Sequence, residues 1–521
     1  MVLPKLPIGL QDFRKIRENG FKYVDKTRYI YQLCQNPGAF FLSRPRRFGK
    51  SLTVSTLQEL HLGSRELFEG LWIEDKWDWS RKHPVVRLSL EDLDFEKDGL
   101  TVALGRELDN ITSAHGLNPI EGGINFKFHH LLTSLAHHSG RRVVVLIDDC
   151  DAAITHYLNT DIKAAQATRE LLMAFYVVLK ELDAHLELVL LTGENNFLKA
   201  GIFSGFNNLQ DTSLHPAYAT MLGYTQQELE ENFAQEIEVA AEQNKLSREA
   251  LLDKIRYWYN GYRFHINAEK VYNPVSVNLF FNTGEFENYW FATGTPTFLI
   301  NLLKQHGLYD FKLTEQSQIE FDSFDLEDLR PYGLLYQTGY LTMVGRDEYG
   351  IYQLGYPNYE VENSMLAYLL EAFGGVPKGS GLVVALRLEK AFENDDLEQV
   401  MRILQGVFSG IPYPLHDAKA PERFFHAAIH LLFSYMGLRM RSEPCTSEGR
   451  ADVAVETSQR VYILEFKLDQ SAEVALEQIR QKRYHQAFWN LGKPVIAVGV
   501  QLSSKTRNIE AWKAETVADS L

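Results

Sequence analysis

At 521 residues the chain is too long for a single hydrophobic core, so we expect roughly two to four domains. An apolar fraction of 45% with 12% aromatic residues excludes a disordered chain. The net charge of −15 argues against a protein that binds nucleic acid over its whole surface. Residues 418–521 differ, with 14 Lys and Arg against 12 Asp and Glu, and are the better candidate for contact with a polyanion.

The three cysteines, Cys34, Cys150 and Cys445, are far apart and predict neither a disulfide framework nor a zinc cluster. No apolar run approaches the roughly 18 residues that a membrane span needs. The first twenty residues lack the continuous apolar stretch of a secretory signal. Together these features predict a cytoplasmic protein.

Apolar runs alternate with helical patterns between Ala39 and Gly193. The runs read AFFLS, VVRLSL, VVVLID and LVLLTG, and such unbroken runs are typical of strands buried on both faces of a parallel sheet. We therefore predict an α/β domain. The run VVRLSL lies between the runs AFFLS and VVVLID along the chain and predicts an additional strand between them.

The first run leads directly into RPRRFGKSL, where a helix is expected to begin. Gly49, Lys50 and Ser51 form the second half of GxxxxGK[ST], in which backbone N–H groups cradle phosphate, the lysine reaches the outer phosphates and the hydroxyl holds Mg²⁺. Arg44 stands where the first glycine of that motif belongs. A basic loop leading into a helix is the alternative. The predicted ATP-binding residues are Arg46, Arg47, Phe48, Gly49, Lys50, Ser51, Leu52 and Asp148.

The run VVVLID ends in Asp148 and Asp149. Asp148 is predicted to hold Mg²⁺ together with Ser51. Asp149 occupies the position of the acid that activates the attacking water, and its side chain, shorter than that of glutamate, predicts slow hydrolysis. After the next run come Thr192 and the pair Asn195 and Asn196, which either sense the γ-phosphate or form a simple polar turn.

Six stretches together resemble the AAA-ATPase-like proteins that end in a PD-(D/E)XK nuclease-like domain. They are LPIGLQDFRKIRENGFKYVDKT, FFLSRPRRFGKSL, VVVLIDDCD, IFSGFNNLQDTSL, WYNGYRF and VYNPVSV. The resemblance covers nearly the whole chain. In that family the loop form RPRRFGKS is usual, whereas the acidic motif is more often IDEYD than IDDCD. The roles commonly suspected for this family are in mobile elements and defence, which the resemblance extends to this chain as an expectation.

Between the two motif regions the pattern is mainly helical. Helices after Thr225 predict a lid over the nucleotide, and WYNGYRF is expected to pack in that lid rather than touch the nucleotide. A helix, YLTMV, the turn GRDEYG, IYQLGYP and a second helix resemble a winged helix, which either binds DNA or, as we prefer, packs on the ATPase as a relay. The predicted domains are a P-loop AAA-ATPase-like domain 1–225, a helical lid 226–315, a winged-helix-like segment 316–375, a helical linker 376–417 and a PD-(D/E)XK nuclease-like domain 418–521.

The last hundred residues contain a helix, a strand meander and a second helix, which match the PD-(D/E)XK core. A two-residue turn at Ser458 and Gln459 predicts an antiparallel hairpin in which paired residue numbers add to 917. Asp452 then opposes Glu465 with Cβ atoms roughly 4.5–5.5 Å apart. A divalent cation would explain two adjacent carboxylates. Lys467 shares their face because strand side chains alternate.

The predicted catalytic residues of this domain are Asp452, Glu465, Lys467 and Gln478, with Asp149 serving the ATPase, and Tyr484 is a further polar helper. Asp452 and Glu465 are also predicted metal ligands, together with Glu422 on the preceding helix or, in its place, Glu443. His426 and His430 lie four residues apart, but without a third ligand they are read as surface or packing residues.

We therefore expect an ATP-regulated, Mg²⁺-dependent DNA nuclease. The alternative is a nucleotide-controlled signalling or scaffold protein whose nuclease-like domain binds nucleic acid or a partner without cleaving. RNA in place of DNA also remains open.

Overall fold

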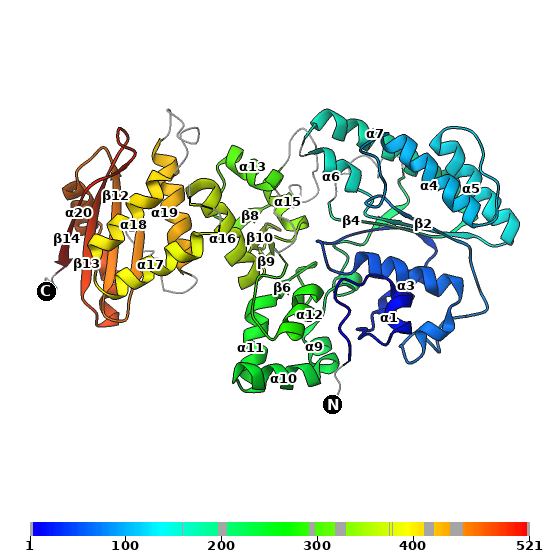
Figure 1. Ribbon diagram of the computed structural model, residues 1–521, viewed down its shortest axis with the longest axis horizontal. Helices are drawn as coiled ribbons and strands as arrows, with labels where there is room; N and C mark the ends of the chain where they lie inside the picture. The colour runs from blue at the N-terminus through cyan, green and yellow to red at the C-terminus, as the bar shows by residue number, and fades with distance from the viewer. Residues whose placement is uncertain are drawn as a thin grey trace. The chain divides into compact units, whose positions relative to one another are not determined.

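The computed structural model describes residues 4–158, 160–195, 206–290, 297–317, 330–374, 376–377, 379–410, 421–437 and 452–517, without the side chains of 297 and 421–424. The chain divides into two compact units (Figure 1). The first comprises Met1–Phe298 with Phe311–Val361, and the second Leu299–Asp310 with Glu362–Leu521.

A five-stranded, wholly parallel sheet forms the centre of the first unit, as the unbroken apolar runs predict. Its spatial order is β2 (Val85–Ser89), β3 (Val143–Asp148), β4 (Leu186–Gly193), β1 (Gly38–Ser43) and β5 (Leu209–Asp211). The strand that separates the two motif strands β1 and β3 in space is β4, whereas β2, which lies between them along the chain, is at the edge. The carboxyl ends of these strands share one edge of the sheet, where ligands of open α/β sheets bind.

Helices cover both faces of this sheet (Figure 1). On one side lie α1 (Phe13–Glu18) and α3 (Lys50–Leu62), and on the other α4 (Leu100–Ala114), α5 (Ile124–Ser139), α6 (Ala152–Leu158) and α7 (Ile162–Glu181). The helix α2 (Thr27–Cys34) precedes β1. The helix α7 begins where the sequence supplies a cap, because the Asp161 carboxylate accepts from the backbone N–H groups of residues 163 and 164.

The predicted helical stretch after Thr225 is present. It contains α9 (Gln226–Asn232), α10 (Ala234–Asn244), α11 (Arg248–Tyr259) and α12 (Pro274–Thr283), with the short pair β6 (Asn260–Tyr262) and β7 (Val271–Tyr272). Thr225 and Glu228 form a reciprocal capping box at the start of α9. Gly261 in WYNGYRF has a φ of 139°, and a Cβ there would lie 1.7 Å from the carbonyl oxygen of Pro357, so the motif requires glycine.

The stretch that resembles a winged helix contains the expected elements. They are α15 (Pro331–Gln337), the strands β9 (Thr342–Arg346) and β10 (Tyr352–Gly355), and α16 (Tyr359–Gly374). A further strand, β8 (Thr314–Gln316), pairs with β10 and completes a three-stranded sheet of order β8-β10-β9.

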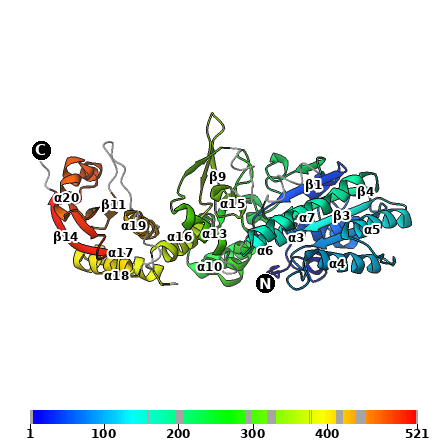
Figure 2. The ribbon, with the colours of Figure 1, turned by 90° about the horizontal axis from the view of Figure 1, so that it is seen from above.

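The second unit contains a four-stranded sheet of order β11 (Val453–Glu456), β12 (Val461–Leu468), β13 (Val495–Ser503) and β14 (Asn508–Val517). Strands β12 and β13 are parallel and joined through α20 (Ala472–Gln481) and a 3-10 segment, Tyr484–Leu491. Figure 2 shows α20 on one face of the sheet and α17 (Gly381–Glu393) and α18 (Leu397–Ser409) on the other. The remaining helices are α13 (Thr297–His306) and α19 (Pro421–Gly437).

None of the described helices combines the length and the apolar character that crossing a bilayer requires.

Candidate functional sites

The loop between β1 and α3 has the backbone of a phosphate-binding turn. Gly49 adopts a φ of 97° immediately before α3, and Arg47 also has a positive φ, of 67°. The Lys50 side chain is buried, with its Nζ donating to the Arg44 carbonyl oxygen at 3.1 Å and lying 3.8 Å from Asp149 Oδ1. Ser51 follows in the first turn of α3. The structure therefore places Lys50, Ser51 and the acidic strand end at one edge of the sheet.

Arg44, which replaces the first glycine of the motif, is a buried structural residue. Its guanidinium donates to the carbonyl oxygens of Ser43 (2.8 Å), Ser213 (2.7 Å) and Tyr218 (2.9 Å). It also lies 4.1 Å from the ring centre of Phe264, in the WYNGYRF stretch. Burial lowers the pKa of Arg44 to about 10, which still leaves the side chain charged at neutral pH. The residue thus fastens the loop to neighbouring segments.

Replacing Arg44 by the glycine of the general motif, Arg44→Gly, is therefore expected to destabilise the protein. Three carbonyl oxygens would lose a charged donor, and leaving buried acceptors unpaired costs about 1–3 kcal/mol each, so we expect a loss of at least about 2 kcal/mol. Chemical denaturation followed by circular dichroism measures it, with Arg65→Gly, at an exposed arginine, as control. An unchanged denaturation midpoint for Arg44→Gly would contradict this role.

The neighbouring loop residues are also held by protein groups. Arg46 Nε lies 2.6 Å from Glu194 Oε1, on a side chain that is 61% exposed. Arg47 donates to the carbonyl oxygens of Tyr289 (3.0 Å) and Trp290 (3.3 Å). Each guanidinium bonds these partners through one nitrogen, Nε of Arg46 and one terminal nitrogen of Arg47, and has further N–H groups.

Phe48 is buried between two rings of the WYNGYRF stretch. Its ring centre lies 4.8 Å from that of Tyr262 and 5.3 Å from that of Phe264, both edge-on. Tyr262 and Phe264 of WYNGYRF therefore pack against the phosphate-binding loop. Leu52 lies in the first turn of α3 and is partly buried.

The acidic strand end forms a compact hydrogen-bonded group with Thr192 of β4. Thr192 Oγ1 donates to Asp148 Oδ1, and the backbone N–H of Asp149 donates to Thr192 Oγ1 at 3.3 Å. Asp149 has a φ of 48°, a left-handed conformation that aspartate tolerates better than most residues. Burial, opposed by Lys50, raises the pKa of Asp149 to about 7. Thr192 therefore orients the predicted Mg²⁺ ligand.

Asp151 is a third carboxylate of this group, and no role was predicted for it from the sequence. It is 2% exposed and accepts from the backbone N–H groups of Glu194 (3.1 Å) and Asn195 (2.7 Å). Burial raises its pKa to about 6. Asp151, the third acid of IDDCD, thus holds the turn after β4. Its place close to Asp148 and Asp149 in the sequence was the signal that could have pointed to it. Asn196 lies outside the described residues.

In the second unit, the hairpin register is the one predicted. Val453 pairs with Leu464 and Glu456 with Val461, so paired numbers add to 917, and Thr457 N–H donates to the Arg460 carbonyl across the turn. Asp452, directly before the first paired residue, lies beside Glu465: its backbone N–H donates to Glu465 Oε2 at 3.4 Å. The Asp452 carboxylate in turn accepts from the N–H of Phe466 at 2.8 Å.

Glu465 is the centre of a buried polar cluster. Its side chain is 2% exposed, and its Oε1 accepts from Lys467 Nζ (2.9 Å) and from Gln478 Nε2 of α20. Gln478 Nε2 also lies 3.4 Å from the Tyr484 hydroxyl. Burial, followed by the neighbouring Asp452, raises the pKa of Glu465, and Lys467 opposes the shift. The structure brings together Asp452, Glu465, Lys467, Gln478 and Tyr484, five residues that the sequence singled out.

The structure does not describe the side chains of the other two predicted metal ligands, Glu422 and Glu443. Glu422 lies in the first turn of α19 but its side chain is outside the description, and Glu443 falls in an undescribed stretch. Among the described residues no three His, Cys, Asp or Glu side chains are grouped closely enough to hold a metal ion. His430 Nε2 lies 3.5 Å from Asp310 and its ring packs on Tyr309, which favours the packing interpretation.

Comparisons with known proteins identify a different domain family in each of the two units. A family model described as a predicted AAA-ATPase matches residues 7–203, and a model of the PD-(D/E)XK nuclease superfamily matches residues 420–512. The chain is 35% identical over 530 residues to an uncharacterized protein in the vnfD 5' region of Azotobacter chroococcum mcd 1, covering 98% of this chain and 99% of that protein.

Proposed function

Because the chain belongs to the AAA-ATPase-like proteins with a C-terminal PD-(D/E)XK nuclease superfamily domain, we propose that it is an ATP-regulated, Mg²⁺-dependent DNA endonuclease. The observation that carries the proposal is the cluster around Glu465. Two carboxylates meet at the open end of a hairpin, and a lysine and a glutamine converge on one of them. A buried carboxylate beside a second one is costly for folding, so a catalytic purpose explains it better than stability.

The donor chemistry of this cluster fits Mg²⁺, which prefers carboxylate oxygens and keeps several waters. Asp452 and Glu465 would hold it, with the Glu422 carboxylate as a further candidate on α19. The ion would supply Lewis acidity at the scissile phosphate and a more acidic water. Lys467 would stabilise the charge that develops on the phosphate, since its Nζ already lies on the same face. Gln478 would orient Glu465.

The first unit supplies the nucleotide-binding part of the proposal. Lys50 would neutralise the outer phosphates, and Ser51 with Asp148 would hold Mg²⁺. Asp149, whose pKa lies near neutrality, would orient or deprotonate the attacking water. Its short side chain leads us to propose slow turnover.

Incubating the purified full-length chain with supercoiled plasmid and Mg²⁺ tests the function directly, with and without ATP. We expect nicked and linear products that depend on Mg²⁺ and disappear with EDTA, and a rate that changes when ATP is present. A parallel reaction with single-stranded and duplex RNA identifies the polymer. Absence of cleavage of DNA and RNA under all nucleotide conditions would contradict the nuclease proposal and support the scaffold alternative.

A further inference from the structure

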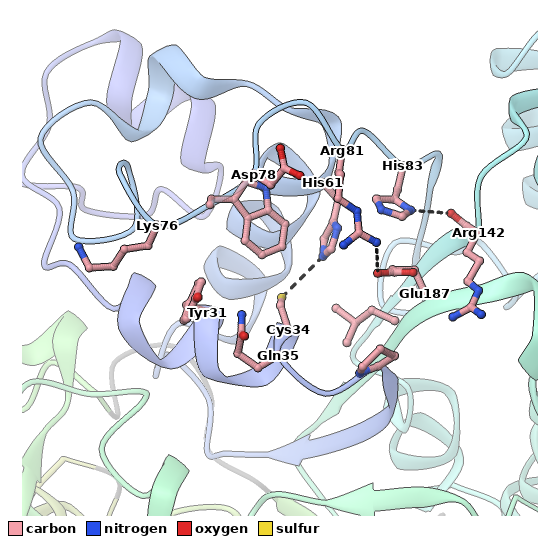
Figure 3. Close-up of a pocket in the computed structure, with 13 residues that line it drawn as sticks. Tyr31, Cys34, Gln35, His61, Lys76, Asp78, Arg81, His83, Arg142 and Glu187 are labelled. Atoms are coloured by element: carbon pink, nitrogen blue, oxygen red, sulfur yellow. Dashed lines mark hydrogen bonds and ion pairs between the residues drawn. The ribbon is translucent and has the colours of Figure 1, made fainter.

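A cavity of about 370 Å³ opens at the amino-terminal edge of the parallel sheet, the edge opposite the phosphate-binding loop (Figure 3). His83 lies two residues before β2, Arg142 lies directly before β3, and Glu187 is the second residue of β4, so three strand starts contribute to its wall. Tyr31 from α2 and His61 from the last turn of α3 complete it. No role assigned so far uses this cavity.

His61 presents a ring nitrogen without a partner among the described residues that line this cavity. Its ring is 2% exposed, and its Nε2 lies 3.7 Å from Cys34 Sγ. Burial raises the pKa of the Cys34 thiol and lowers that of His61 to about 3, so a protonated thiol faces a neutral imidazole and either group can donate in this contact. The other ring nitrogen, Nδ1, has no hydrogen-bond partner among the residues that the structure describes, and it carries the proton when the thiol donates to Nε2.

A buried donor or acceptor without a partner costs about 1–3 kcal/mol, which a ligand that pairs with it would recover. His83 does not supply that partner, because its Nδ1 faces the Arg142 carbonyl oxygen at 2.9 Å. The indole Nε1 of Trp77, another lining residue, is likewise buried without a partner in the described part of the chain. Within the described residues, an indole donor and an imidazole nitrogen without partners therefore line one cavity.

Three basic and two acidic side chains line this cavity. Arg81, Arg142 and Lys76 line it, against the acids Asp78 and Glu187. Arg81 reaches Glu187 at 3.6 Å, and Lys76 is held by Asp75 outside the cavity. The Arg142 guanidinium has no hydrogen bond or ion pair with any described residue, and its side chain is exposed. A ligand that supplies an anionic oxygen would pair with the Arg142 guanidinium and accept from the unpaired indole N–H of Trp77.

We propose that this cavity binds a small molecule carrying a phosphate or carboxylate group, whose oxygen accepts from His61 Nδ1 while Arg81 and Arg142 balance its charge. The rings of Tyr31 and Trp77 give the cavity an aromatic wall for the remainder of the ligand. The site is separate from the nucleotide loop, since the two lie at opposite edges of the sheet.

Isothermal titration of the full chain with three probes tests the proposal: inorganic phosphate, adenosine 5′-monophosphate and citrate. The Lys50→Ala variant serves as the reference protein, so that the loop does not compete for nucleotide. We expect one-to-one binding of at least one probe, weakened at least about 10-fold in Arg81→Gln/Arg142→Gln, whose side chains are exposed enough to leave folding intact. Arg65→Gln, at an exposed arginine outside the cavity, should bind as the reference does.

The three probes separate the ligand classes. Binding of inorganic phosphate would show that a phosphate group alone is sufficient. Binding of adenosine 5′-monophosphate without binding of phosphate would show that the aromatic wall also contributes. Binding of citrate alone would assign the site to carboxylates. Binding of none of the three, or equal binding by the double arginine variant, would overturn the proposal.

Discussion

Replacing Glu465 by glutamine is expected to reduce DNA cleavage by at least about 10²-fold while the protein stays folded. The side chain keeps its size and can still accept from Lys467 and Gln478 through its amide oxygen. It loses the negative charge that would hold Mg²⁺ beside Asp452. Because burial and Asp452 already penalise the charged form of Glu465, removing that charge should not lower stability. Plasmid cleavage rates in Mg²⁺ and thermal melts measure the two effects.

The matched control is Glu456→Gln, on the same hairpin. Glu456 pairs with Lys493 at 2.7 Å and lies at the turn end, away from Asp452. Its substitution should leave cleavage near the wild-type rate. Cleavage at that same rate by a correctly folded Glu465→Gln protein would remove the cluster from the proposed mechanism.

Lys467 is expected to act differently from the carboxylates. Its side chain is 23% exposed, and an ammonium is not a metal ligand, so Lys467→Met should leave Mn²⁺ binding intact while slowing cleavage by about 10²-fold. Lys513→Met, at an exposed lysine of the same sheet that pairs with Glu473, is the control. Loss of Mn²⁺ affinity in Lys467→Met would show that the lysine only organises the carboxylates.

The parts that could be predicted from sequence are those fixed by local pattern. The parallel strands follow from unbroken apolar runs, and the register at Asp452 and Glu465 follows from a two-residue turn together with the alternation of side chains. Both depend only on residues near one another in the chain. The resemblance to a known family extended this to the order of domains.

The contacts that escaped prediction join segments far apart in sequence. From the sequence, Arg44 could be compared only with the first glycine of the motif, yet its partners Ser213 and Tyr218 lie about 170 residues away. Asp151 holds the turn after β4, which no local pattern around IDDCD indicates. The position of β4 between β1 and β3 is likewise a property of the sheet and not of chain order. Side-chain roles of this kind follow from tertiary packing.

Lys50→Ala is expected to weaken ATP binding by about 10²-fold or more. The ammonium is buried beside Asp149 and anchored to the Arg44 carbonyl, so it is positioned before any nucleotide arrives. Truncating a buried, charged partner of a phosphate costs about 2–5 kcal/mol, and each 1.4 kcal/mol is a factor of ten in affinity. Titration with a fluorescent ATP analogue in Mg²⁺ measures the loss, and Lys163→Ala, at an exposed lysine of α7, should bind as the wild type does.

The same variant separates the loop's phosphate contact from its structural role. Lys50→Ala leaves Asp149 without its nearest cation, and because Lys50 opposes the effect of burial, the pKa of Asp149 should rise further. That carboxyl would then be protonated at neutral pH and cost little stability, so the thermal melt without nucleotide should shift only slightly. Added Mg²⁺-ATP should raise the melting temperature of the wild type and not of Lys50→Ala, because only a ligand that binds the folded state stabilises it. Equal stabilisation of both proteins by ATP would place the nucleotide somewhere other than this loop.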